Sequence, residues 1–447
     1  MSRPLETFDV AIIGGGPAGA SAALTLRKRP DLRVCVPEAA PGPRRKVGES
    51  LSPGVRSLIG YLGVWDSVTD GQSLDLWGSE AAWGSDTMVS LDYIHTLHGS
   101  GWSLDRARFD RSLLDAADTA GAEVMRGTKV TGLRREGEGW TLSLDGSKAS
   151  SIRARYVIDA AGRASPWSAK AGFQRKRHDN LVAATRWFDL GNSNAPTTVT
   201  RVESVAEGWW YAAVVPGPFL VVSFMTDAAQ LHTRRLKTAR GWWAALQQTR
   251  HIAEIVRGRE DQRDPDVAAA HSSVVHPPRT TVPLTVAGDA AASHDPLSSS
   301  GIPHALGSGI QAGRVAADAL FGNGALAEAY HASLAADFRR YLNTQWMTYC
   351  LETRFPQAPF WASRQRKASV APEALCTADP EMIRAAAPLV PRRVLRTIET
   401  LAREPRPAHR IVADLRAMEP SMPDETLILA IQETCRIRDR SAPASPN

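Results

Sequence analysis

A glycine-rich turn between an apolar run and an alanine-rich run constrains the fold of this chain more than any other stretch. The run Asp9–Ile13 is mostly apolar with β-branched members, which predicts a buried strand. Gly14, Gly16 and Gly19 follow in a G-x-G-x-x-G pattern, and Ala18–Leu26 predicts a helix. In this arrangement the first glycine allows a tight turn, the second lets the backbone approach a pyrophosphate, and the third lets the helix pack on the strand.

A carboxylate follows at the offset that dinucleotide-binding folds use. A second predicted strand, Leu32–Val36, ends just before Glu38, which lies 19 residues beyond Gly19. An acid about 20 residues past the last glycine binds a ribose hydroxyl in such folds. A lone G-x-G-x-x-G is a weak signal, but here a strand, a helix, a second strand and an acid frame it. We therefore predict an α/β protein with a Rossmann-type dinucleotide-binding domain.

Length and composition narrow the class of protein. The 447 residues suffice for two to three ordinary domains, and the 43% hydrophobic and 22% charged content is typical of a soluble globular protein. No apolar run reaches the ~18 residues that span a bilayer, and the early first strand leaves no room for a signal peptide. The scattered cysteines show no metal-ligand spacing and indicate a reducing compartment. A net charge of +6 does not demand nucleic acid. We expect a cytoplasmic protein with no metal, membrane or nucleic-acid partner.

The segment after Glu38 adds candidate cofactor contacts. Its basic loop includes Lys46, and a glycine turn from Gly48 to Ser50 precedes an amphipathic helix. A glycine turn before a helix lets the backbone approach a ring system closely. A solvated loop is the alternative for the basic residues. We predict Lys46, Gly48 and Ser50 as cofactor contacts.

Three later segments complete a pattern that resembles a known family. They are Gly101–Asp110 (GWSLDRARFD), Tyr156–Gly162 (YVIDAAG) and Val282–Ala305 (VPLTVAGDAAASHDPLSSSGIPHA). Together with the first motif they resemble the flavin-dependent tryptophan halogenase and aromatic monooxygenase superfamily, over roughly residues 1–345. The resemblance implies FAD as the cofactor. It implies contacts to FAD from Arg106, from Val130 in the predicted strand Ala122–Thr131, and from Asp159, Gly162, Asp289, Pro296, Gly301 and Ile302. The alternatives are a helical ion pair for Arg106 and a helix cap for Asp159.

The remaining sequence predicts how the domains are arranged. An FAD-binding domain within residues 1–350 (about 1–65, 100–180 and 275–350) is interleaved with a mixed-sheet substrate domain (about 66–99 and 181–274). Residues 351–447 form a C-terminal helical region, in which seven arginines lie between Arg392 and Arg416. Within the substrate domain, 209–215 and 219–224 read as strands joined by a turn. Trp209, Trp210 and Tyr211 partly match an aromatic motif of flavin halogenases and are predicted to line the substrate pocket.

The closest resemblance is to one branch, the flavoproteins that mature tryptophylquinone cofactors. It implies that reduced FAD and O2 form a C4a-hydroperoxide, which hydroxylates the indole of a tryptophan in a partner protein twice. The implied partner is the quinone-cofactor subunit of an amine dehydrogenase or a similar protein, and NAD(P)H or reduced flavin supplies the electrons. His294 and Asp295 are candidates for proton transfer, with a loop hydrogen bond as the alternative for each.

Two differences argue against a halogenase. No lysine occurs between Lys46 and Lys129, whereas halogenases use a lysine between flavin and substrate. This chain also has P-L-S-S-S-G at Pro296–Gly301 where tryptophan halogenases have P-L-E-S-T-G. Other functions stay open: a small-molecule aromatic hydroxylase or halogenase, a flavin reductase of isoprenoid type, and a non-catalytic FAD-binding scaffold or maturation chaperone.

Overall fold

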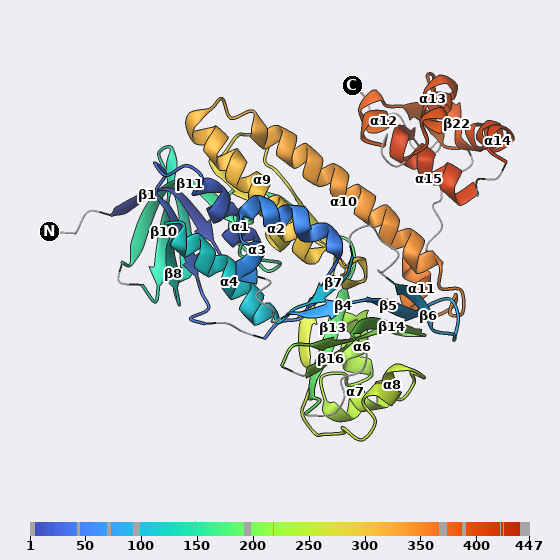
Figure 1. Ribbon diagram of the computed structural model, residues 1–447. Helices are drawn as coiled ribbons and strands as arrows, with labels where there is room; N and C mark the ends of the chain where they lie inside the picture. The colour runs from blue at the N-terminus through green and yellow to red at the C-terminus, as the bar shows by residue number, and fades with distance from the viewer. Residues whose placement is uncertain are drawn as a thin grey trace. The chain divides into compact units, whose positions relative to one another are not determined.

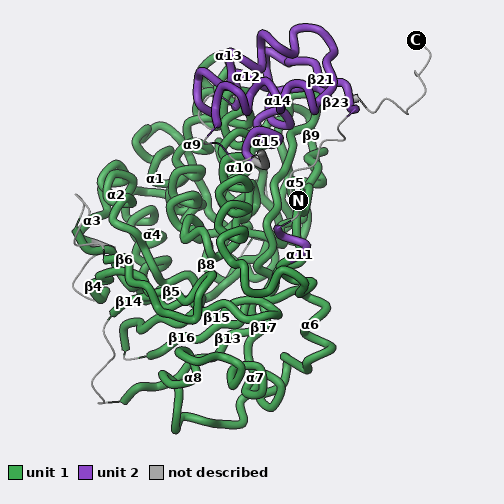
Figure 2. The backbone as a smooth tube through the Cα atoms, turned by 90° about the vertical axis from the view of Figure 1, so that its right-hand side faces the viewer, with its two compact units in different colours: residues 1–361 green, residues 362–447 purple. Residues whose placement is uncertain are grey.

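The chain forms two compact units, residues 1–361 and residues 362–447, which Figure 2 colours separately. This computed structural model describes residues 5–42, 45–68, 73–92, 99–147, 149–191, 198–217, 219–365, 373–386, 390–420, 422 and 424–438. The boundary falls after Trp361 and not at the predicted residue 350. The reason is that Phe360 and Trp361 are buried in an aromatic cluster of the first unit, together with Trp209 and Tyr349.

A seven-stranded sheet carries the first motif. Its order is β8-β2-β1-β11-β10-β9, with β19 paired to β11, and β1 runs parallel to both β2 and β11. Its strands are β1 (Glu6–Ile13), β2 (Val34–Glu38), β8 (Glu123–Arg126), β9 (Lys129–Glu136), β10 (Gly139–Asp145), β11 (Ser151–Asp159) and β19 (Leu284–Val286). The predicted strand Ala122–Thr131 is thus two strands, because the chain turns at Gly127, where φ is +71°.

Helices cover both faces of this sheet, which explains the continuous apolar run in β1. Val10 and Ile12 pack in the core on the side of α1, α4 and α9, whereas Ala11 and Ile13 share a core with residues of α10. Figure 1 shows the long helices α9 and α10 side by side. The helices of this region are α1 (Pro17–Leu26), α2 (Arg56–Leu62), α3 (Trp65–Val68), α4 (Arg106–Thr119), α5 (Trp167–Lys170), α9 (Gly301–Phe321) and α10 (Leu326–Cys350).

Helices α1 and α9 pack so closely that their backbones are in contact. A Cβ added at Gly309 of α9 would lie 2.2 Å from the carbonyl oxygen of Ala18 in α1. Likewise, a Cβ at Gly19 would lie 1.9 Å from the carbonyl oxygen of Gly14. The third glycine of the motif therefore has the packing role that the sequence predicts. These contacts hold the ends of α1 and α9 at the same edge of the sheet.

A second seven-stranded sheet combines segments that lie far apart in the sequence. Its order is β17-β13-β16-β15-β14-β5-β6, and β5 pairs in parallel with β14. Its strands are β5 (Gly78–Ala82), β6 (Val89–Asp92), β13 (Leu181–Asp189), β14 (Val199–Val205), β15 (Gly208–Val215), β16 (Phe219–Asp227) and β17 (Asp266–Ala269). The helices α6 (Ala228–Thr233), α7 (Ala239–Leu246) and α8 (Ile252–Ile255) follow β16. As predicted, β15 and β16 form an antiparallel hairpin that turns at Gly217.

Smaller elements complete the chain. The first unit has the short strands β3 (Ser50–Leu51), β4 (Leu74–Leu76), β7 (Gly101–Ser103), β12 (Gln174–Arg177), β18 (Ser273–His276) and β20 (Ala292–Ser293), and α11 (Pro359–Arg364) reaches the unit boundary. The second unit has β21 (Leu375–Ala378), β22 (Arg406–Pro407), β23 (Cys435–Arg438), α12 (Pro380–Ala386), α13 (Arg392–Leu401), α14 (Ala408–Met418) and α15 (Asp424–Thr434). The mixed α/β architecture and the C-terminal helices are confirmed. Among the residues described, no helix is both long and apolar enough to cross a membrane.

Candidate cofactor and active site

The predicted cofactor segments meet at one edge of the first sheet. In the parallel register, Ile13 of β1 lies beside Asp159 of β11, and Asp159 lies beside Val286 of β19. The backbone continues the pairing beyond the strand ends, since Ala160 N–H donates to the carbonyl of Ile13 over 3.0 Å and Ala287 N–H to that of Asp159 over 2.9 Å. Ligands of such sheets bind outside the carboxyl ends of the strands.

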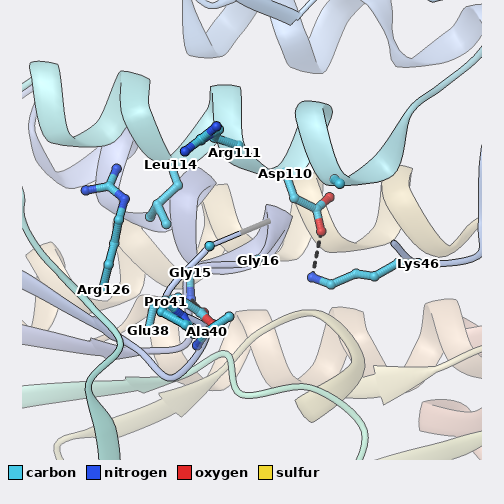
Figure 3. A pocket seen from close by; sticks show the side chains of 12 residues that line it. Gly15, Gly16, Glu38, Ala40, Pro41, Lys46, Asp110, Arg111, Leu114 and Arg126 are labelled. Carbon is cyan, nitrogen blue, oxygen red and sulfur yellow. Dashed lines mark hydrogen bonds and ion pairs between the residues drawn. The ribbon is translucent and has the colours of Figure 1, made fainter. Parts of the chain in front are cut away.

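A pocket open to solvent lies at this edge, between the glycine turn, the loop after β2 and helix α4. Glu38 lies in it and organises the glycine turn (Figure 3): its carboxylate accepts the Gly15 N–H over 2.6 Å and the Ala40 N–H over 2.7 Å. The lining residues are Gly15, Gly16, Glu38, Ala40, Pro41, Gly42, Lys46, Ala107, Asp110, Arg111, Leu114 and Arg126. The ribose-binding carboxylate that the sequence predicts thus lies beside the glycine turn.

Gly16 forms the cradle that a dinucleotide phosphate needs. It is the N-cap of α1, and no atom lies within 4 Å of the position that a Cβ would occupy. The helix N-terminus presents backbone N–H groups and a positive dipole end to this open space. Gly14 instead provides the turn, with φ at +102° and a Cβ position 2.7 Å from the Ala160 carbonyl oxygen. The residues present therefore fit an FAD diphosphate.

Two ion pairs of the buried Asp110 brace the loop that follows Glu38. Asp110 of α4 pairs with Lys46 over 2.9 Å and with Arg106 over 3.1 Å. Arg106 also donates to the carbonyl oxygens of Val47 (2.9 Å) and Gly48 (3.1 Å). Gly48 has φ at +91°, and a Cβ there would lie 2.8 Å from the Arg106 guanidinium. The structure therefore brings together the predicted residues Lys46, Gly48 and Arg106. Arg106 holds the loop through its hydrogen bonds to Val47 and Gly48, and it also pairs with Asp110 of its own helix.

Asp159 has a structural role close to the helix-cap alternative, because its carboxylate accepts an N–H group in the first turn of α5. Its side chain has no solvent-exposed surface, and it accepts hydrogen bonds from the Ser165 hydroxyl (2.7 Å) and from Ser168 N–H (2.9 Å). These contacts match the structural alternative, and the direct cofactor contact expected of Asp159 stays a prediction. The carboxylate folds the loop that includes Gly162, whose φ is +83°.

Asp289 remains a candidate ligand of the cofactor. It lies in the short turn Gly288–Ala290 after β19, is partly exposed, and pairs with Arg163 over 3.2 Å. Pro296 begins another short turn, Gly301 is the exposed first residue of α9, and Ile302 packs into the core. Val130 of β9 is buried in the core on the other face of the sheet, which leaves only its backbone for a cofactor contact.

Replacing Arg106 or Asp289 by alanine should weaken FAD binding while the fold persists. Arg106→Ala removes the brace of the Gly48 loop, and Asp289→Ala removes a partly exposed carboxylate at the strand edge. Loss of a charge-assisted hydrogen bond typically costs ~1.5–3 kcal/mol, which is about a tenfold to hundredfold rise in Kd. Titration of the apoprotein with FAD, followed by flavin fluorescence, measures the change. Unchanged affinity in both variants would place the cofactor elsewhere.

The aromatic strand β15 divides its side chains between two faces. Trp210 is fully buried on the side of α7, stacked on Phe224 at 4.5 Å and against Trp242 at 5.1 Å. The expectation that Trp210 lines the substrate pocket is therefore wrong, because successive side chains of a strand point to opposite faces. Trp209 and Tyr211 share the other face. Trp209 is also buried there, at 1% exposure, so only Tyr211 of the three predicted pocket residues is partly exposed.

Two hydrogen-bond links join this face of β15 to the predicted cofactor segments. The Tyr211 hydroxyl lies 2.7 Å from Ser50 Oγ. Trp209 Nε1 donates to the Tyr349 hydroxyl over 3.0 Å, and that hydroxyl donates to Asp295 Oδ2 over 2.6 Å. Predicted substrate residues and predicted cofactor residues thus meet between the two large sheets.

His294 and Asp295 are engaged within their loop. Burial, together with His304 and Arg163, lowers the pKa of His294 to about 3, so its imidazole is neutral at pH 7. Its Nδ1 lies 2.7 Å from Ser300 Oγ, and its ring stacks on Tyr341. Asp295 is buried, which raises its pKa, and it accepts hydrogen bonds from Tyr349, Leu297 N–H and Gln345. These contacts match the alternative reading, and proton transfer by either residue stays a prediction.

Sequence reasoning missed several residues of the site. Arg163 joins Asp289 to the carbonyl oxygen of His294, and Arg126 closes the pocket beside Glu38. Glu49 lies buried next to Tyr211. An arginine just after the Y-V-I-D-A-A-G segment was a local signal for Arg163. No local signal distinguishes Glu49 from an exposed glutamate.

Comparison with known proteins agrees with this geometry. The family model for the FAD binding domain matches residues 7–340 of the chain. The protein therefore belongs to this family, and its cofactor is FAD. It is an FAD-dependent enzyme of the flavin halogenase and monooxygenase superfamily.

Individual relatives cover most of the chain. A putative FAD-dependent oxidoreductase of Marinomonas mediterranea, LodB, is 30% identical over 80% of this chain and 97% of its own length. The myxobacterial chondrochloren halogenase CndH superposes with a TM-score of 0.73 and 19% identity, over 96% of this chain and 97% of that chain. QhpG, a peptidyl tryptophan dihydroxylase essential for tryptophylquinone cofactor biogenesis, has a TM-score of 0.67 and 21% identity, over 95% of this chain and 98% of that chain. At these identities, the two solved structures show a shared fold.

Proposed function

We propose that this protein is an FAD-dependent monooxygenase that hydroxylates, twice, the indole ring of a tryptophan residue in a partner polypeptide during tryptophylquinone cofactor biogenesis. The observation that carries the proposal is the sequence of two segments. Residues 298–300 are serines, and no lysine occurs between Lys46 and Lys129, so both segments lack the groups that a halogenase is expected to use with hypohalous acid. The fold shared with a peptidyl tryptophan dihydroxylase over nearly the whole chain supports it further.

The chain's own residues have three tasks in this reaction. The glycine turn and Glu38 bind the adenosine and diphosphate part, and the braced Gly48 loop fixes the backbone next to the ring system. Tyr211, the partly exposed aromatic residue on this face of β15, positions an indole, for which an aromatic side chain provides stacking and edge contacts. Bound reduced FAD supplies the activation of O2 for transfer to an electron-rich ring.

A polypeptide substrate accounts for features that flavin chemistry does not require. The second unit has seven arginines between Arg392 and Arg416, against three acidic residues. Arg392 and Arg396 are exposed on α13, whereas Arg393 pairs with the buried Glu419. An excess of exposed positive charge raises the association rate with an acidic partner, and this effect is lost at high salt. The four cysteines are free thiols, which suits the proposed cytoplasmic location.

The test of substrate size compares two substrates. The enzyme, with FAD, NADH and O2, is given either free L-tryptophan or the unmodified quinone-cofactor subunit of an amine dehydrogenase. We expect oxygen to be added to the subunit and free tryptophan to be left unchanged. Replacing Arg392 and Arg396 by glutamate should slow modification of the subunit and leave flavin reduction unchanged. The paired Arg393 is kept so that α13 retains its contact with Glu419. Efficient turnover of free tryptophan, with arginine variants equal to wild type, would favour a small-molecule hydroxylase.

A halogenase is the second candidate, because halogenases are among the structures with the same fold. Adding bromide to the reaction distinguishes it. Incorporation of bromine into either substrate would support this candidate against the proposal.

A further inference from the structure

One buried acid, Glu49, makes no ion pair within 4 Å among the residues that the structure describes. Glu49 follows Gly48 directly and is 1% exposed. Its backbone carbonyl accepts Leu104 N–H over 2.9 Å, and the neighbouring Ser50 pairs with Ser103 of β7. The backbone of Glu49 is therefore held by an antiparallel pairing on one side and by the Arg106 brace on the other.

The carboxyl group of Glu49 is only partly satisfied. Its Oε2 accepts the Tyr211 hydroxyl over 3.4 Å, whereas its Oε1 is buried with no hydrogen-bond partner among the described residues. Buried polar atoms are nearly always hydrogen-bonded, and exceptions mark places where a ligand or a water binds. The free Oε1 therefore points to a polar atom of a bound group at this junction.

The charged and titratable groups around Glu49 leave it ready to hold a proton. Arg106 of α4 and Tyr211 of β15 both favour its ionised form, but Arg106 is already paired with Asp110. The facing strand β7 contributes Ser103, which does not titrate and donates to the Val214 carbonyl. Burial outweighs these groups and raises the pKa of Glu49 to about 7.

A hydroxyl chain connects Glu49 to half-exposed residues. Ser50 Oγ and the Tyr211 hydroxyl lie 2.7 Å apart, and Tyr211 donates onward to Glu49. Both Ser50 and Tyr211 are less buried than Glu49. When Glu49 gives up its proton, the Tyr211 hydroxyl can donate a proton to it. Tyr211 then takes a proton from Ser50, and Ser50 takes one from water.

Monooxygenation creates a need for such a group. Each hydroxyl group inserted consumes one O2, two electrons from NAD(P)H or reduced flavin, and two protons. One oxygen atom enters the ring and the other leaves as water. We propose that Glu49 is the acid that protonates the oxygen atom leaving as water, and that Ser50 and Tyr211 recharge it. This inference rests on the proposed function. In the step, the O–H bond of Glu49 breaks, an O–H bond of water forms, and the carboxylate regains a proton from Tyr211.

The first test measures the proton without measuring activity. Thermal unfolding of the FAD-loaded wild type and of Glu49→Gln is compared between pH 5 and pH 8.5. The native pKa lies above the ordinary value, so the native state holds more protons and wild-type stability falls from about pH 4.5 to pH 7. Glutamine has no such loss. We expect similar Tm values at pH 5 and a Tm gap in favour of Glu49→Gln that opens toward pH 7.

Infrared spectra supply a second readout and a control. A protonated carboxyl band should titrate near pH 7 in wild type and be absent in Glu49→Gln. Glu138 is exposed, so Glu138→Gln is the control. We expect this variant to have the wild-type Tm at each pH and to keep the carboxyl band. The assignment would be overturned if the Tm difference between Glu49→Gln and wild type did not depend on pH and the carboxyl band were still present in Glu49→Gln.

The kinetic test separates this inference from the proposed function. With the polypeptide substrate, we expect the wild-type rate to fall above about pH 7, and Glu49→Gln to be at least tenfold slower with that inflection lost. Glu49→Asp should restore part of the rate, and FAD affinity should stay unchanged. If Glu49→Gln hydroxylates the polypeptide at the wild-type rate and with its pH profile, the inference fails while the proposed function stands. If the carboxyl titrates as expected but no oxygen enters the polypeptide, the proposed function fails instead.

Discussion

Gly16→Val should yield a folded protein that no longer retains FAD. The backbone at Gly16 has φ at −69° and ψ at −177°, which a branched residue adopts without strain. The space around its Cβ position is open, so the valine meets no protein atom there. It would instead fill the space at the N-terminus of α1 where the diphosphate approaches the backbone. We expect FAD affinity to fall at least about 100-fold, or about 3 kcal/mol, and the purified protein to be colourless.

A matched control distinguishes loss of the ligand from general damage. Gly60 of α2 is exposed and also has no atom within 4 Å of its Cβ position, so Gly60→Val adds the same side chain away from the site. We expect this control to be yellow, with a flavin-to-protein ratio equal to wild type. A yellow Gly16→Val protein with full flavin content would contradict the placement of FAD at this turn.

Gly309→Val should instead damage the fold itself. The added Cβ would lie 2.2 Å from the carbonyl oxygen of Ala18, a backbone atom that cannot move unless α1 and α9 separate. Such overpacking costs about 3 kcal/mol or more, and the shift would also displace the N-terminus of α1. Denaturant unfolding monitored by circular dichroism measures the loss. The neighbouring Gly307 has open space at its Cβ position, so Gly307→Val is the control. Equal stability of the two variants would show that the contact between α1 and α9 is looser than described.

Local patterns predicted the cofactor half of the site well. The strand, turn and helix at residues 9–26 and the later segment at Gly288 form within short stretches of chain, so their residue types report directly on their conformation. The position of Trp210 was also open to prediction, because alternation along β15 requires it to point away from Trp209 and Tyr211. The partial match to a halogenase motif led us to place all three aromatic residues on one face, although successive side chains of a strand point to opposite faces.

Other features depend on contacts between distant residues. Glu49 meets Tyr211 from 162 positions away, and Arg163 meets Asp289 across two different loops. Nothing in the sequence around Glu49 shows that its side chain is buried, because the burial comes from the second sheet. The extent of the first unit was misjudged for the same reason, since Trp361 is a core residue only through its contact with β14 and its aromatic neighbours. The hydrogen bonds of Asp159 likewise come from two serines downstream, which hold its carboxylate.

The most direct test of the proposed function follows oxygen atoms into the polypeptide. The FAD-loaded enzyme, NADH and ¹⁸O2 are incubated with the unmodified quinone-cofactor subunit of an amine dehydrogenase, with chloride and bromide present, and the subunit is digested for mass spectrometry. We predict two ¹⁸O atoms on the ring of a single tryptophan, and none when Gly16→Val replaces the wild type. A halogen atom on that ring, or a subunit that stays unmodified, would contradict the account.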